Sequence, residues 1–122
     1  MMSLLYVFLG GGLGALCRYW IGLALGGGGD QGIPWHTLLS NFVACFIAGA
    51  AMAWLPRSGF YTEGRLWLLT GFCGGFSTFS TFGLEVMAMI QRGHWTQAVM
   101  YILISLCATG LGVFSGWKIF NG

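Results

Sequence analysis

The residues that could do chemistry gather in one stretch, Gly71–Phe82, which reads Gly-Phe-Cys-Gly-Gly-Phe-Ser-Thr-Phe-Ser-Thr-Phe. Three glycines are followed there by four hydroxyl residues within five positions. Adjacent glycines are poor helix formers and expose the backbone. Irregular backbone at membrane depth is tolerated only where protein or water covers it, and broken helices of this kind often build ion sites. The stretch therefore predicts a helix that is interrupted near the midplane of a bilayer, in an arrangement typical of ion sites.

Aromatic and polar side chains follow different edges of the helix that resumes after the glycines. Phe79 and Phe82 are three residues apart and share one face, whereas Thr81 and Glu85 are four apart and share another. One interpretation is that the rings fill a core while the hydroxyls bond back to the helix backbone. The density of hydroxyl groups, the glycine break and Glu85 together favour the alternative, in which this face has a functional role.

Polar residues also interrupt the other apolar segments. A charge in a spanning segment costs a few kcal/mol, so Arg18 either extends to the headgroups or faces a water-filled vestibule that attracts anions. Asn41 either makes a hydrogen bond between helices or donates from its NH₂ group to an anion passing through a pore. A polar stripe follows one face of the last segment, at Tyr101, Ser105, Thr109 and Gly112.

Four apolar segments must position these side chains. Of the 122 residues, 57% are hydrophobic and only 7% are charged, against roughly 25% charged in soluble domains. The segments cover about 4–25, 36–55, 66–90 and 98–120, and each is long enough to cross a bilayer. We predict an all-α membrane protein with four transmembrane helices, forming a single domain over residues 1–122, with the third helix broken near 74–78.

Small residues and charges constrain how these helices associate. Gly10 and Gly14 form a GxxxG pair, which predicts close helix packing. The net charge of +2 argues against nucleic acid as a partner. Three basic residues lie on the side of the termini and one on the other, a weak bias under the positive-inside rule. This bias allows either one fixed orientation or insertion both ways up as an antiparallel pair. The basic residues are Arg57, Arg65 and Lys118 on the first side and Arg92 on the other.

The stretch Gly71–Phe82 closely resembles the signature of the CrcB/Fluc fluoride channel family, and the resemblance covers the whole chain. The early glycines with Arg18, Asn41, the length and the four-span layout are also similar. The resemblance implies an antiparallel, dual-topology homodimer with two fluoride pores, each using side chains from both subunits. It further implies a multi-pass protein of the bacterial plasma (inner) membrane that passively exports fluoride from the cytoplasm and so lowers its toxicity.

The same resemblance implies roles for particular residues. Glu85 is not assigned by the resemblance, and its position on the same helix indicates a gating or structural group near one pore mouth. A sodium ion at the dimer axis would be bound by the backbone carbonyls of Gly74 and Ser77. The family often has Thr where this chain has Ser77, but a backbone carbonyl serves equally from either residue. The side chains of the fluoride pore would be Asn41, Phe79, Ser80, Thr81, Phe82, Tyr101 and Ser105.

A fluoride pore is physically consistent with these residue types, and other classes of protein explain less. Fluoride holds its water tightly, so a pore must replace that water with amide and hydroxyl donors or with the positive edges of aromatic rings. A small multidrug transporter would leave the glycine break and the Phe and hydroxyl pattern without a role. A non-transporting membrane subunit would explain the size but not the polar stripes. No nucleophile–base pair, metal-ligand cluster or GxxxxGK[ST] motif indicates an enzyme.

Overall fold

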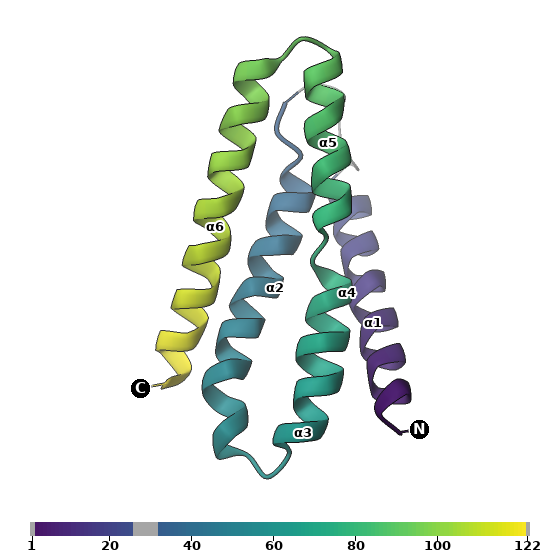
Figure 1. Ribbon diagram of the computed structural model, residues 1–122, viewed down its shortest axis with the longest axis vertical. Helices are drawn as coiled ribbons and strands as arrows, with labels where there is room; N and C mark the ends of the chain where they lie inside the picture. The colour runs from purple at the N-terminus through teal and green to yellow at the C-terminus, as the bar shows by residue number, and fades with distance from the viewer. Residues whose placement is uncertain (1, 26–31, 122) are drawn as a thin grey trace.

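The computed structural model describes residues 2–25 and 32–121, and the secondary structure of this part of the chain is entirely helical (Figure 1). Three helices are long and continuous: α1 (Met2–Ala24), α2 (Trp35–Trp54) and α6 (Trp95–Asn121). Between α2 and α6 the chain forms a run of shorter helices. These are η1 (Leu55–Arg57), α3 (Tyr61–Gly64), η2 (Arg65–Cys73), α4 (Gly74–Phe76) and α5 (Phe79–Gln91). The prediction of an all-helical chain is confirmed.

Within the described ranges, three helices are long and apolar enough to cross a membrane: Met2–Ala24, Trp35–Arg57 and Trp95–Asn121. Much of their apolar surface points outward, since Leu4 and Phe8 are 71% and 75% exposed. Large contiguous apolar surfaces of this kind are typical of contact with lipid or with another protein. Contact with water would therefore be unfavourable for this surface.

The third predicted segment is divided at Ser77 and Thr78. Both residues are extended, with φ −77° and ψ 154° at Ser77 and φ −146° and ψ 122° at Thr78. The break lies within the predicted range of 74–78, but it follows the glycines and does not include them. Gly74 and Gly75 are helical. A Cβ atom at Gly75 would collide with the backbone of Gly11, so this glycine serves close packing rather than unwinding.

Glycines allow close packing at two helix contacts. The predicted packing of Gly10 and Gly14 is confirmed, because a Cβ atom at either position would collide with the carbonyl of Trp67 or Phe72. This contact joins α1 to η2 and α4, and Figure 1 shows α1 running beside them. In the second pair, α2 and α6 approach through Gly49 and through two glycines of α6, Gly112 and Gly116.

The helix before the break is a π-helix over nine residues, Arg65–Cys73, which the apolar pattern did not predict. The wider turn lets the amide of Gly74 reach the carbonyl of Leu69, five residues back. Such turns are frequent at functional sites. Here only the short helix α4 separates the π-helix from the break.

Both termini of the described chain and the turn between α2 and α3 lie at one end of the molecule, as the segment count predicts (Figure 1). Arg57 links two of these parts, because its Nη2 donates to the backbone oxygen of Asn121 at 2.7 Å. The turn between α5 and α6 lies at the opposite end (Figure 1). The break thus lies between two polar ends, along the apolar length of the bundle.

Gly116→Ala should destabilise the protein, because its Cβ would collide with the carbonyl of Phe46 and lie 3.0 Å from the amide of Ala50. Overpacking of this kind costs about 1–3 kcal/mol. Thermal unfolding in detergent measures the effect. Gly110→Ala in the same helix is the control, because its Cβ has no neighbour within 4 Å among the described residues. Equal unfolding temperatures for the two variants would contradict close packing of α2 on α6.

Candidate functional site

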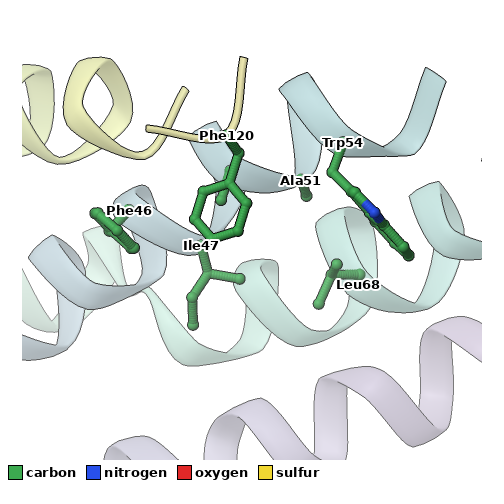
Figure 2. A pocket seen from close by; sticks show the side chains of 7 residues that line it. Phe46, Ile47, Ala51, Trp54, Leu68 and Phe120 are labelled. Atoms are coloured by element: carbon green, nitrogen blue, oxygen red, sulfur yellow. The ribbon is translucent and has the colours of Figure 1, made fainter. Parts of the chain in front are cut away.

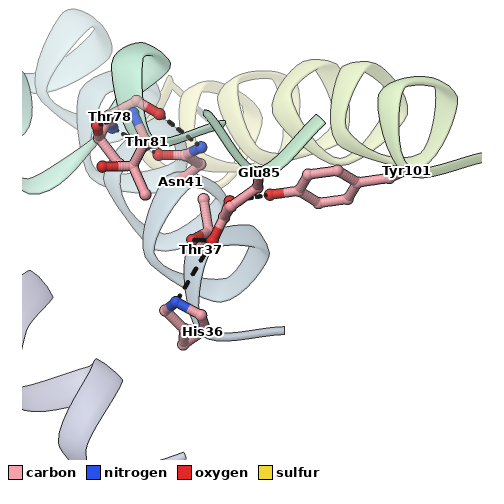
Figure 3. A network of polar contacts seen from close by, with 7 residues as sticks. All are labelled: His36, Thr37, Asn41, Thr78, Thr81, Glu85 and Tyr101. Carbon is pink, nitrogen blue, oxygen red and sulfur yellow. Dashed lines mark hydrogen bonds and ion pairs between the residues drawn. The ribbon is translucent and has the colours of Figure 1, made fainter. Parts of the chain in front are cut away.

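One side chain of α2 stabilises the break in the third segment. The amide of Thr78 donates to Oδ1 of Asn41 at 2.8 Å, and Nδ2 of Asn41 donates to the carbonyl of Thr78 at 3.3 Å (Figure 3). Unpaired backbone groups inside a protein or membrane are costly, so this two-point contact stabilises the extended conformation. Of the two interpretations of Asn41, the structure bears out the hydrogen bond between helices. Since the carboxamide nitrogen carries two N–H donors, the pore role stays a prediction.

The helix restarts after the break because Thr78 caps it. Its Oγ1 accepts a hydrogen bond from the amide of Thr81 at 3.1 Å, which satisfies one of the unpaired donors in the first turn of α5. The same hydroxyl lies 3.4 Å from the hydroxyl of Ser80, which is exposed. The hydroxyl cluster thus has a local structural role, and Ser80 also faces outward.

The carbonyl of Gly74, just before the break, loses its usual helical partner. In a continuous helix the amide of Thr78 would bond to the carbonyl of Gly74, but here it bonds to Asn41. Gly74 is exposed. The carbonyl of Gly75 instead accepts a hydrogen bond from Nε of Arg18 at 3.3 Å. Ser77 donates from both its amide and its hydroxyl to the carbonyl of Cys73, at 2.9 and 2.8 Å. The break therefore presents carbonyl oxygens of the kind that bind hard cations.

A hollow of about 230 Å³ lies beside the break, between α1, α2 and the start of α5, and we call it the polar hollow after the polar side chains that form part of its otherwise apolar lining. Arg18 is half-buried and lines it, so its guanidinium lies against protein at the break. This placement agrees with a cation that faces an aqueous vestibule, which stays a prediction. The lining of this polar hollow includes Arg18, His36, Thr37, Thr78 and Thr81.

Glu85 is the centre of a hydrogen-bond network near this hollow (Figure 3). The hydroxyl of Tyr101 donates to Oε1 at 2.7 Å, and the hydroxyl of Thr37 donates to Oε2 at 2.7 Å. Nε2 of His36 lies 3.5 Å from the same Oε2. Tyr101 and Thr37 are 0% and 2% exposed, so both hydroxyls need the carboxylate as a partner. The network ties α2, α5 and α6 together.

An aromatic row runs from the surface to this network. The rings of Phe79 and Phe82 are stacked with centroids 5.7 Å apart, and Phe82 lies 5.1 Å from the ring of Tyr101. Phe79 is 83% exposed, whereas Tyr101 is buried. Ser105 lies one turn beyond Tyr101 on α6 and is half-buried. The structure thus groups the two phenylalanines, Tyr101 and Glu85, and leaves Ser105 outside this group.

The sequence interpretation missed two members of the network. Thr37 precedes Asn41 by four residues and so shares its face of α2, a spacing that could have identified it. The other is His36, in the first turn of α2. Its contact with Glu85 joins residues 49 positions apart, which no local pattern reports.

A second hollow, of about 270 Å³, is apolar and lies towards the end of the molecule with the termini (Figure 2). Its lining includes Phe46, Trp54, Leu68 and Phe120. None of these four side chains is charged, and the indole N–H of Trp54 is the one hydrogen-bonding group among them. Within the described chain, the candidate functional residues therefore lie at the break and in the Glu85 network.

A family model described as CrcB-like protein, Camphor Resistance (CrcB), matches residues 5–117. The chain belongs to this family. With its three long apolar helices, this CrcB family member is a multi-pass membrane protein.

Relatives of the CrcB family member carry the name fluoride-specific ion channel FluC. The one from Pseudomonas aeruginosa is 42% identical over 123 residues, covering 96% of each chain. That from Novosphingobium aromaticivorans is 39% identical over 124 residues, covering 100% of this chain and 98% of the relative. That from Klebsiella pneumoniae is 40% identical over 101 residues, covering 82% of this chain and 79% of the relative.

Asn41→Ala should loosen the break, because it removes both contacts to the backbone of Thr78. Leaving buried backbone groups unpaired costs about 1–3 kcal/mol. Hydrogen exchange at the Thr78 amide is the direct measurement, and protection should fall. Asn41→Asp is the matched variant, since it keeps an oxygen for that amide and should retain protection there. Unchanged protection in Asn41→Ala would show that something else holds the break.

Proposed function

We propose that this protein is a fluoride-selective ion channel that passively exports fluoride from the cytoplasm. The observation that carries the proposal is its 42% identity over 96% of its length to a relative named fluoride-specific ion channel FluC. The polar and aromatic groups beside the helix break suit that role. The protein is a channel and not an enzyme.

The chemistry of fluoride explains the residue types. A small anion that holds water tightly must receive hydrogen bonds in place of that water. Asn41, Ser80 and Thr81 supply such donors, with Tyr101 and Ser105 further along. Aromatic rings have positive edges, so Phe79 and Phe82 form a passage that favours an anion along their rims. Arg18 at the polar hollow attracts anions towards this passage.

Passive conduction is sufficient for export. Fluoride enters cells as neutral HF from acidic surroundings and is trapped as the ion inside. The negative potential of the cytoplasm then drives the anion outward through a selective channel, with no need for ATP. The bacterial plasma (inner) membrane, which carries this potential, is the location that fits.

The segmented helices α3 to α5 cross the membrane as one broken unit in this proposal, giving four spans. In a single subunit, Phe79 is 83% exposed and Ser80 is also exposed. Hydroxyls and free carbonyls facing lipid would lack partners. A second, oppositely inserted subunit would cover this face, and the weak charge bias allows both insertions. The dimer then has two pores, each lined by side chains from both subunits.

A structural sodium ion on the dimer axis is a further part of the proposal. Gly74 and Ser77 would contribute their carbonyl oxygens, a donor type that suits a hard cation. Gly74 is exposed and has lost its helical partner at Thr78, so its oxygen is available to a neighbouring subunit. Two carbonyls are too few for a full coordination shell, whereas two antiparallel subunits supply four. The bound charge would also hold the subunits together.

Phe79→Ile and Phe82→Ile should each cut fluoride efflux from proteoliposomes by roughly tenfold or more, since about 1.4 kcal/mol lost from the ion in transit is a tenfold change in rate. A fluoride electrode reads efflux after valinomycin is added, with chloride as the comparison ion. Phe8→Ile, an exposed ring on α1, is the matched control and should conduct normally. Absence of fluoride efflux from folded parent protein would overturn the proposed function, and normal efflux in both variants would overturn the aromatic pore.

Replacing sodium with a large organic cation should weaken the dimer and lower fluoride efflux, because the carbonyls at the break would repel one another without a cation. Gel filtration measures the dimer, and the electrode measures efflux. Ser77→Ala is the matched variant, since it removes the hydroxyl but keeps the backbone carbonyl and should retain the sodium dependence. A dimer and an efflux that are both indifferent to sodium would contradict this site.

A further inference from the structure

Among the described residues that contact the Glu85 carboxylate, His36 is the one whose side chain can change its charge near neutral pH. Its Nε2 lies 3.5 Å from Oε2, and the two side chains are 20% and 18% exposed. The hydroxyls of Thr37 and Tyr101 already occupy one position on each carboxylate oxygen. A carboxylate has about four lone-pair sites, so a third donor can be accepted. The imidazole is placed to be that donor.

The same imidazole lines the polar hollow together with Arg18 of α1. The ring lies against α1, where a Cβ atom at Gly22 would be 3.9 Å from its Cδ2. In the described chain, the charged or titratable groups around His36 are Arg18 and Tyr19 on α1, Glu85 on α5 and, behind the carboxylate, Tyr101 on α6. A neutral imidazole leaves one positive and one negative charge here. A protonated imidazole leaves two positive charges and one negative.

We propose that His36 is a proton-sensitive positioning residue that sets how readily anions enter the polar hollow, an inference that rests on the proposed fluoride channel. When it gains a proton, the imidazolium pairs with Oε2 of Glu85 and offsets the carboxylate's repulsion of an approaching anion. It also adds a second positive charge across the hollow from Arg18. Charged clefts with low-dielectric walls raise the local concentration of oppositely charged ions, so fluoride entry increases.

The pairing would also hold the network in place. Glu85 accepts from Tyr101 and Thr37, and a third bond from a cationic donor is stronger than one from a neutral donor. The carboxylate is then held between α2 and Tyr101. Its negative charge interferes less with an anion when three donors point at it. His36 would thus act through Glu85, without contacting the ion.

The test is the pH profile of fluoride efflux from proteoliposomes, corrected with protein-free vesicles for leakage of neutral HF. The parent should conduct about three- to tenfold faster at about pH 6 than at about pH 8. His36→Gln should be slow at both values, because glutamine can donate a hydrogen bond but carries no charge. His36→Arg should be fast at both, because its charge is fixed. A merely structural histidine would not give opposite results with these two variants.

His94→Gln is the matched control, since the chain has two histidines and His94 is exposed between α5 and α6. It should keep the parent's pH profile. A profile that is flat in the parent, or that persists in His36→Gln, would overturn the inference while leaving the fluoride channel intact.

A readout without efflux separates the inference from the proposed function. In NMR spectra of the folded parent, the Nε2–H signal of His36 should show a hydrogen bond to a carboxylate that is lost in Glu85→Gln, whereas the signals of His94 should be alike in both. A parent that conducts no fluoride at any pH would overturn the proposed function. Identical Nε2–H signals of His36 in parent and variant would overturn its pairing with Glu85.

Discussion

The pairing of Asn41 with the backbone of Thr78 is the contact on which the site depends. A break inside an apolar bundle leaves amides and carbonyls without helical partners, and this cost must be met within the protein. One carboxamide supplies both an acceptor at 2.8 Å and a donor at 3.3 Å. The extended pair Ser77 and Thr78 can then persist, and the carbonyl of Gly74 is released from the helix.

Close glycine contacts give this break a rigid surround. Gly10 and Gly14 seat α1 against the helix before the break, while Gly49 and Gly116 seat α2 against α6. Because α2 carries Asn41 and His36 and α6 carries Tyr101, these contacts determine where the polar groups meet. A single subunit nevertheless leaves Phe79 almost fully exposed. The face that carries the site is also the face that lacks a covering, which is why the proposed function requires a second copy.

Charge placement connects the break to the Glu85 network. Arg18 donates to the carbonyl of Gly75 on one side of the polar hollow, and His36 approaches Glu85 on the other. A fixed cation and a titratable group therefore face the same small volume. In a low-dielectric bundle such charges act strongly on an ion nearby. The proposed channel thus has an entrance whose electrostatics differ from those of the aromatic row beyond it.

The sequence by itself determined the helical class, the apolar segments and the position of the break to within a few residues, because hydropathy, glycine content and hydroxyl density are local properties. It also identified Gly10 and Gly14 as packing residues from their spacing. Only the tertiary structure decided that Asn41 bonds to Thr78, that Gly75 packs against α1 instead of unwinding, and that His36 and Thr37 meet Glu85. Each of these contacts joins segments far apart in the chain, and their partners depend on how neighbouring helices are rotated, which no spacing within one segment specifies.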